Sequence, residues 1–166
     1  PEELHTAKKV AGELAKQHCN FFTFECRNLF HSSDLPFTIE QLPGIFTEFR
    51  KRTEKTVAIR LVFPRPSSIV SPPIEALHLM LLDKLIETDV IVDPRAAIHF
   101  KGGAEAARQR LAYYFYQTQS LSTYKETRNE MLGQGYSTKF SAWLALGCIS
   151  AKEIYEEVKA YEALYG

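Results

Sequence analysis

A proline-rich stretch at residues 60–73 constrains the fold of this chain more than any other feature. It contains four prolines and three serines. Proline has no backbone N–H and a fixed φ, so it breaks helices and is excluded from the interior strands of a sheet. We therefore interpret this stretch as a linker or an extended crossing, and we expect the residues on either side of it to form separate structural units.

The residues before this stretch suggest the end of an α/β layer. Residues 3–17 have apolar side chains at helical spacing, which predicts a surface helix. The aromatic-rich FFTFEC, residues 21–26, predicts a short strand. One strand does not make a stable sheet, so we expect the rest of the sheet to lie upstream of this chain. The chain starts at Pro1 and not at Met, which suggests a fragment or a processed product.

Three further helices are expected before residue 93. Thr38 and Gln41 match a capping box for a very short helix that ends at Pro43. Residues 46–55 have a helical pattern, and their basic run Arg50–Arg52 is typical of a solvated helix face. Residues 74–88 predict another helix.

From Asp93 onward the pattern is helical throughout. Residues 104–117 predict a strong helix whose buried stripe is formed by Ala107, Leu111, Tyr114 and Phe115. Further helices are predicted at residues 122–132, at 140–146 with Trp143 in the core, and from a Ser150–Glu153 capping box to about Leu164. Lys101, Gly102 and Gly103 predict a turn into the first of these helices.

Composition excludes several classes of function. The net charge is zero, so bulk charge gives no argument for binding nucleic acid or membranes. The three cysteines (Cys19, Cys26, Cys148) are widely spaced and match no zinc motif, and no histidine has convincing metal-ligand spacing. We therefore expect no bound metal. Charged residues interrupt the longest apolar run, residues 74–86, so we also expect no membrane span.

Small polar residues gather before the 140–146 helix. Ser137, Thr138, Ser141 and Lys139 supply hydroxyl donors and one positive charge where a helix begins. Hydroxyls, a lysine and a helix N-terminus suit a phosphate or diphosphate. Ordinary capping by Ser137 or Ser141, with Lys139 in solvent, explains the same residues, and spacing alone favours it. The segment is not a glycine-rich P-loop.

Three segments in order resemble the photolyase/cryptochrome family. STKFSAWLALGCIS (residues 137–150) resembles the stretch that opens the cofactor-binding helical domain of that family. FKGG, a helix and YKETRNEM resemble the preceding part of the same domain. SSDLPFTIEQLPGIFTEFRKRTEK resembles the strand-to-linker region of the DASH branch.

The resemblance implies a fold class of an α/β remnant followed by an all-α part. Residues 1–36 would be the last helix–strand unit of an α/β photolyase domain. Residues 37–92 would be an inter-domain linker with short helices, and residues 93–166 the N-terminal part of the helical FAD-binding domain.

The resemblance also assigns binding residues. Ser137, Thr138, Lys139, Phe140 and Ser141 would wrap the diphosphate of FAD, with Phe140 packing inward. Tyr124 would contact the flavin cofactor, and Arg128 would face DNA. Without the family, Tyr124 is a half-buried helix tyrosine and Arg128 a partner of Glu126 or Glu130. The resemblance assigns no catalytic residue to this chain.

Two positions depart from the family pattern. Ala142 and Ala151 stand where the family usually has proline. Proline in a first helical turn pre-organises the backbone, so alanine there loses about 0.5–1 kcal/mol of pre-organisation. The change fits either a looser cofactor site or a domain that no longer binds flavin.

Three functions follow from the resemblance. The first is FAD-dependent, blue-light-driven repair of cyclobutane pyrimidine dimers in single-stranded or lesion-containing DNA, an activity of the deoxyribodipyrimidine photo-lyase type. It belongs to a longer protein and not to this chain alone, and an antenna folate is a further expected cofactor. The others are a flavin photoreceptor without repair and a degenerate, cofactor-free module. The family occurs in the bacterial cytoplasm, in plastids and in mitochondria, so we expect a soluble intracellular protein without a fixed compartment.

Overall fold

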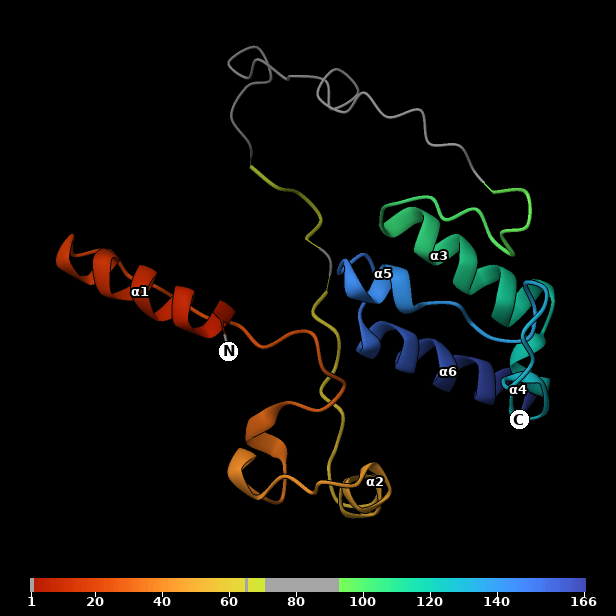
Figure 1. Ribbon diagram of the computed structural model, residues 1–166, viewed down its shortest axis with the longest axis horizontal. Coiled ribbons are helices and arrows are strands. Elements are labelled where there is room, and N and C mark those ends of the chain that lie inside the picture. Colours follow the sequence, from red (N-terminus) through yellow and green to blue (C-terminus); the bar gives the residue numbers. More distant parts are fainter. Residues whose placement is uncertain (1, 65, 71–92) are drawn as a thin grey trace, which may run out of the picture.

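The computed structural model describes residues 2–64, 66–70 and 93–166, and its regular elements are all helical (Figure 1). Before the proline-rich stretch lie α1 (Glu2–Lys16), the 3₁₀ turns Ser32–Asp34 and Ile39–Gln41, and α2 (Phe46–Thr53). After residue 93 come α3 (Ala104–Ala112), a π-helical turn (Tyr113–Gln117), a 3₁₀ turn (Ser120–Thr123), α4 (Tyr124–Thr127), α5 (Ser141–Ala145) and α6 (Ala151–Tyr165).

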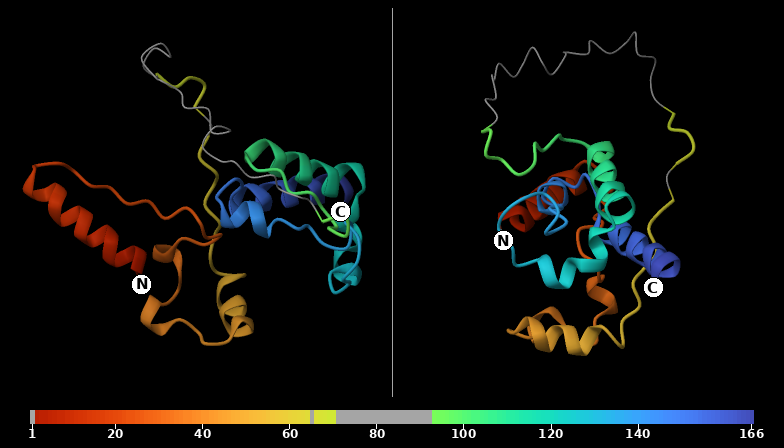
Figure 2. Two further views of the ribbon diagram at one scale, coloured as in Figure 1. Left: turned by 45° about the horizontal axis from the view of Figure 1, so that its top comes forward. Right: turned by 90° about the vertical axis from the view of Figure 1, so that its right-hand side faces the viewer.

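Helices α3 and α6 lie side by side (Figures 1 and 2), and the core is formed by side chains from both of them, the π-helical turn, α5 and the adjoining loops. Among the described residues, the buried apolar side chains are Ala107, Leu111, Tyr114, Phe115, Phe140, Trp143, Ile149 and Tyr161. Two polar contacts also join the helices: Arg108 Nε lies 2.9 Å from a Glu153 carboxylate oxygen, and the Tyr116 hydroxyl donates to Glu157 at 2.8 Å. The predicted stripe of residues 104–117 is therefore confirmed as core.

The end of α3 widens into the π-helical turn. The Thr118 N–H donates to the Tyr113 carbonyl at 2.9 Å, a spacing of five residues where an α-helix has four. Tyr114 and Phe115, which are consecutive in the chain, are both fully buried there. The wider turn thus directs two large aromatic rings into the same core.

Trp143 anchors α5 to the glycine turn that precedes α3. Its indole Nε1–H donates to the Lys101 carbonyl at 2.9 Å, and its ring lies 5.0 Å from that of Phe100. Gly103 stands at the N-cap of α3 with a φ of 92°, a left-handed conformation that glycine adopts without strain. The predictions of a turn at residues 101–103 and of a core position for Trp143 are both confirmed.

The region before the proline-rich stretch has much less buried surface. Helix α1 has no buried residue, and in Figures 1 and 2 it stands away from the other helices. The rings of Phe30, Phe37 and Phe46 surround Phe49 with centroid distances of 6.1, 5.9 and 6.3 Å. Within residues 2–64, Thr53 alone is buried. This region is a small aromatic cluster with extended connections.

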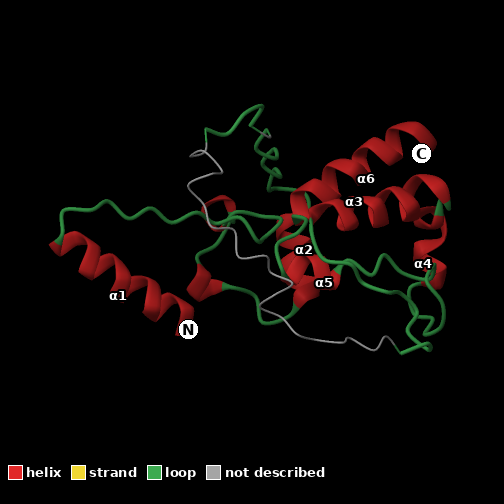
Figure 3. Cartoon of the chain, turned by 90° about the horizontal axis from the view of Figure 1, so that it is seen from above, coloured by secondary structure: helices red, strands yellow, loops and turns green. Residues whose placement is uncertain are grey.

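The strand predicted at residues 21–26 is wrong for this structure. The described residues contain no strand, as Figure 3 also shows, and residues 21–26 form an exposed connection in which Phe24 is 84% exposed. A strand needs a partner for its backbone N–H and C=O groups, and no other described segment offers one. The described structure therefore supports the all-α part of the predicted fold class and not its α/β part.

Other predicted boundaries also changed. The helices expected at residues 3–17, 46–55, 140–146 and 150–164 are present. The helix expected at residues 122–132 is only the single turn α4, since Thr127 Oγ1 donates to the Tyr136 carbonyl at 3.0 Å and the chain turns back after Arg128. Thr38 makes no side-chain cap, so the capping box with Gln41 does not form. The helix predicted at residues 74–88 lies outside the described residues.

Candidate phosphate-binding loop

Residues 136–140 lead into α5, and we call them, together with Ser141 at the first position of α5, the hydroxyl loop. Ser137, Thr138 and Lys139 are half-buried, and Ser141 is exposed. Phe140 is buried and lies 6.2 Å, centroid to centroid, from the ring of Phe115. Phe140 therefore fixes the loop to the core while its polar neighbours remain reachable from solvent.

The serines of this loop do not cap α5. The N-cap position belongs to Phe140, and no side chain accepts a hydrogen bond there. Among the described residues, the side chains of Ser137, Thr138 and Ser141 have no hydrogen-bond partner. Helix α5 has five residues, too short for its dipole to support an anion site. Ordinary capping thus does not explain the hydroxyls.

Lys139 adopts an uncommon backbone conformation. Its φ is 60°, in the left-handed region that a residue with a Cβ enters at a cost of about 1 kcal/mol. Its ammonium nitrogen lies 3.6 Å from the centroid of the Tyr136 ring and contacts the Tyr136 hydroxyl. The cation is therefore held beside the loop by a cation–π contact, and it does not extend freely into solvent.

Arg110 of α3 holds the hydroxyl loop from the inside. The side chain is only 7% exposed. Its Nε donates to the Thr138 carbonyl at 3.0 Å, and its Nη2 donates to the carbonyls of Gln134 and Ser137 at 2.6 and 3.0 Å. Burial lowers the pKa of the guanidinium, because the charged form loses solvation.

Sequence reasoning missed Arg110, although the pattern contained a signal. Position 110 lies three residues after Ala107 and four before Tyr114, on the face predicted to be buried. A charged residue on an apolar helix face requires a set of partners. The carbonyls of Gln134, Ser137 and Thr138 are those partners.

Tyr124 and Arg128 lie on one face of α4. The Arg128 N–H donates to the Tyr124 carbonyl at 3.0 Å, so the two residues are one helical turn apart. Both are exposed, and among the described residues Arg128 has no ion pair with Glu126 or Glu130. The Thr127 hydroxyl ties this turn to the Tyr136 carbonyl. The structure thus places α4 next to the start of the hydroxyl loop.

The hydroxyl of the core residue Tyr114 is buried and has no hydrogen-bond partner among the described residues. Burial is the main cause that raises its pKa, and the neighbouring Tyr124 hydroxyl contributes. The Arg110 guanidinium lies 5.3 Å from the Tyr114 ring centroid. A buried hydroxyl without a partner is uncommon in folded proteins.

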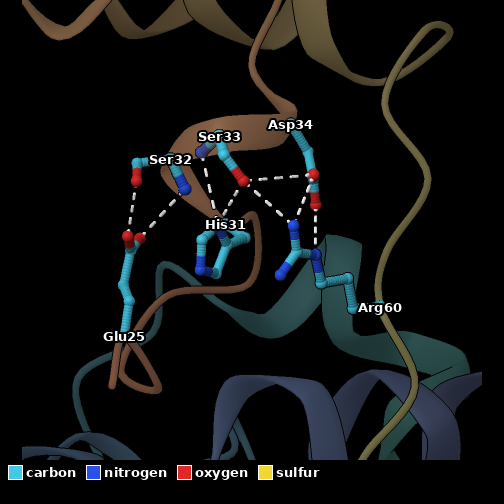
Figure 4. Close-up of polar contacts among 6 residues, drawn as sticks. All are labelled: Glu25, His31, Ser32, Ser33, Asp34 and Arg60. Carbon is cyan, nitrogen blue, oxygen red and sulfur yellow. Dashed lines mark hydrogen bonds and ion pairs between the residues drawn. The ribbon is translucent and has the colours of Figure 1, made fainter. Parts of the chain in front are cut away.

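A second polar cluster lies before the proline-rich stretch (Figure 4). Ser32 donates through its backbone N–H and its hydroxyl to Glu25 at 3.1 and 2.6 Å, and Arg60 donates to both carboxylate oxygens of Asp34 at 2.6 and 2.7 Å. The Arg60 hydrogen bonds lower the pKa of Asp34. These side chains satisfy one another, so the cluster is a structural link between residues 25–34 and Arg60.

The basic run on α2 and the described His, Cys, Asp and Glu side chains suggest no further site. The basic run on α2 is a solvated face, as predicted, where Arg50 and Arg52 pair with Glu54 and Glu48. Within the described ranges, no group of His, Cys, Asp and Glu side chains could hold a metal ion. In the same residues, no helix combines the length and the apolar character that crossing a membrane requires.

Known proteins match this chain over nearly its whole length. No family model matches it. "Cryptochrome DASH" of Gloeobacter violaceus is 42% identical over 164 residues, which cover 97% of this chain and 32% of that protein. "Cryptochrome DASH" of Synechocystis sp. is 46% identical over 162 residues, which cover 97% of this chain and 33% of that protein.

A solved structure gives the same result for the fold. The cryptochrome of Synechocystis sp. PCC6803 superposes with a TM-score of 0.80 at 37% identity, over 98% of this chain and 34% of that one. The chain thus spans about a third of the length of the proteins it matches. Over the segment that it shares with them, the chain belongs to the DASH branch of the photolyase/cryptochrome family.

Proposed function

We propose that this chain supplies part of the diphosphate-binding surface for FAD in a DASH-type photolyase/cryptochrome. The observation that carries the proposal is that the hydroxyls of Ser137, Thr138 and Ser141 are unpaired among the described residues, in the loop that also carries Lys139. Hydroxyl donors without partners of their own, in a loop that also carries a cation, are what phosphate oxygens bind. We also propose that residues 1–36 are the end of an α/β domain, residues 37–92 an inter-domain linker and residues 93–166 the N-terminal part of the helical FAD-binding domain.

The residues present fit such a cofactor. The Tyr114 hydroxyl, which interacts electrostatically with Tyr124, has no hydrogen-bond partner among the described residues and is available to a bound group. Buried aromatic side chains lie directly behind the loop, with Phe140 against Phe115. The site therefore has polar donors on its outer side and an apolar support on its inner side. Among the described residues, no second arrangement of polar donors and apolar support suggests a site for an antenna folate.

In this proposal, each residue has a binding role. Bound FAD would supply the light-driven electron that splits a cyclobutane pyrimidine dimer. Ser137, Thr138 and Ser141 donate to phosphate oxygens, and Lys139 partly neutralises the phosphate charge. Tyr124 contacts the cofactor from α4. Residues of this chain orient the cofactor and do not themselves react.

Arg128 is the proposed contact to DNA. Its guanidinium is exposed and, in the described part of the chain, unpaired, one helical turn beyond Tyr124. A phosphate contact of this kind positions the DNA without reading its sequence. Arg128→Ala should lower affinity for a single-stranded, dimer-containing oligonucleotide and reduce the salt dependence of binding by about one phosphate contact. Lys51→Ala, on the solvated face of α2, is the control and should leave the salt dependence unchanged.

FAD content of the gene product that contains this chain tests the cofactor proposal. We expect about one FAD per chain, released by heat and measured by absorbance. Ser137→Ala/Ser141→Ala should weaken FAD binding roughly tenfold, because two donors to a charged acceptor are lost. Ser67→Ala/Ser68→Ala, which changes two exposed serines of the proline-rich stretch, should not weaken it.

A folded gene product without FAD would contradict the proposal. The degenerate, cofactor-free module would then be the better account, and Ala142 and Ala151, at the first turns of α5 and α6, already favour it. If FAD is present, dimer repair in blue light separates the two remaining functions. Repair supports the photolyase activity, and its absence supports a photoreceptor.

A further inference from the structure

Arg110 is the most deeply buried cation of the described chain, and its contacts are all with neutral groups. Its guanidinium donates hydrogen bonds to three backbone carbonyls, those of Gln134, Ser137 and Thr138. The rings of Tyr113 and Tyr114 lie 5.3 Å from its central carbon. In the described ranges no carboxylate pairs with it. Because no carboxylate neutralises this buried positive charge, it attracts an anion that binds nearby.

The three hydrogen bonds also decide which groups the hydroxyl loop presents to the outside. A phosphate is repelled by carbonyl oxygens and attracted by N–H and O–H donors. The carbonyls of Ser137 and Thr138 are directed toward Arg110, on the core side of the loop. The hydroxyls of the same two residues stay unbonded within the described structure. One side chain thus removes acceptors from the surface where an anion would bind.

We propose that Arg110 is the positioning residue of the hydroxyl loop: it fixes the loop carbonyls inward and places a positive charge behind the phosphate-binding hydroxyls. The inference rests on the proposed function, because it assumes that the loop binds the diphosphate of FAD. Arg110 acts through the loop backbone and makes no contact with the cofactor.

Arg108 provides a matched control on the same helix. It is also an arginine of α3, and its side chain is 33% exposed. It pairs with Glu153 at 2.9 Å and so joins α3 to α6, with no contact to the hydroxyl loop. A substitution at 108 therefore weakens helix packing without changing the loop carbonyls.

The experiment compares two ligands that share the flavin ring and differ in the adenosine diphosphate part. FAD carries it, and riboflavin has the same flavin ring without phosphate. Dissociation constants of both are measured by flavin fluorescence on the apo form of the gene product that contains this chain, for wild type, Arg110→Lys and Arg108→Lys. The ratio of the two constants measures the contribution of the adenosine diphosphate part, and the change of this ratio between wild type and Arg110→Lys measures the contribution of the loop that Arg110 holds. A loss of stability alone would weaken both ligands equally and leave this ratio unchanged.

Arg110→Lys should reduce the preference for FAD over riboflavin at least about tenfold, because an ammonium lacks the fixed fork of donors with which the guanidinium holds the three carbonyls. Arg108→Lys should leave the preference at the wild-type value. An unchanged preference in Arg110→Lys would overturn the inference. Should that variant not fold, Arg110→Gln carries the same test, since its amide donates to carbonyls without burying a charge.

The wild type separates the two proposals. If it binds FAD no better than riboflavin, the proposed diphosphate site itself is wrong. If it prefers FAD and both arginine variants keep that preference, the site stands and only the role of Arg110 is wrong.

Discussion

The two sides of the proline-rich stretch are stabilised in different ways. Residues 93–166 contain all the buried apolar side chains of the described chain, packed between α3, α5 and α6. Residues 2–64 have Thr53 as their buried residue, and their contacts are the rings around Phe49 and the exposed Asp34–Arg60 pair. The two regions meet where the Val62 N–H donates to Glu156 of α6 at 2.8 Å.

This difference separates a region with its own core from one that depends on its surroundings. Burial of apolar surface is the main stabilising term in folding, and exposed ion pairs contribute little. The helical region therefore has the means to hold a binding site in one geometry. The first region exposes Phe22, Phe24 and Phe46 to 73, 84 and 74%, which suits a segment that packs against further protein.

The largest expected effect is on the core of the helical region. Phe115→Ala should reduce the free energy of unfolding by about 3–5 kcal/mol, because it leaves a cavity among Tyr114, Phe140 and Tyr161. Urea unfolding followed by the fluorescence of Trp143, the single tryptophan, measures it. Phe24→Ala removes an exposed ring and is the control. A similar loss in both variants would mean that the two regions do not differ as described.

The cap of α6 should have a smaller effect in the same region. The Ser150 hydroxyl accepts a hydrogen bond from the Glu153 N–H at 3.1 Å. Ser150→Ala should cost about 1 kcal/mol, since one N–H at the helix start loses its partner. The same urea experiment measures it, with Ser68→Ala as the control. A cost as small as that of the control would show that the cap is not needed.

Alkaline pH should weaken the helical region through Tyr116. Burial and the hydrogen bond to Glu157 raise the pKa of Tyr116 to about 12. The raised pKa means that the protonated phenol is favoured by folding, so its contribution is complete below the ordinary tyrosine pKa of about 10 and is lost as pH rises through about 12. Tyr116→Phe should remove about 1 kcal/mol below pH 10 and flatten the decline above it. An equally steep decline in the variant would assign it to another group.

The smallest effect is expected at the Asp34–Arg60 pair. Arg60 lowers the pKa of Asp34, so the contribution of the pair is present above the ordinary carboxyl pKa and is lost as pH falls through the depressed value. Asp34→Asn should speed amide hydrogen exchange in residues 57–62 and leave the Trp143 unfolding curve unchanged. A shift of that curve would show that the first region stabilises the second.

The sequence predicted the helical region best where capping and apolar periodicity agree. Ser150 with Glu153 located the start of α6, and the stripe from Ala107 to Phe115 identified the centre of the core. Such signals are local and depend on neighbouring residues alone. The resemblance of residues 137–150 to the family is confirmed by the comparisons, whereas the binding roles of Ser137, Thr138, Lys139, Phe140, Ser141, Tyr124 and Arg128 remain predictions.

What the sequence did not predict depends on contacts between distant residues. Residues 21–26 have the composition of a strand, but a strand requires a partner that the described residues do not supply. The 122–132 helix is short because Thr127 binds the Tyr136 carbonyl, nine residues away. Arg110 looked like an ordinary helix residue because its three carbonyls lie 24 to 28 residues later in the chain.

The π-helical turn at Tyr113–Gln117 has a consequence for insertions and deletions in this segment. A π-turn is equivalent to one extra residue within an α-helix. Deleting one residue there would restore ordinary α-helical geometry and rotate the residues before it by about 100° relative to those after it. Arg110 would then turn away from the carbonyls that it holds. A relative with a one-residue gap at this place should therefore have lost the arginine, the hydroxyl loop or both.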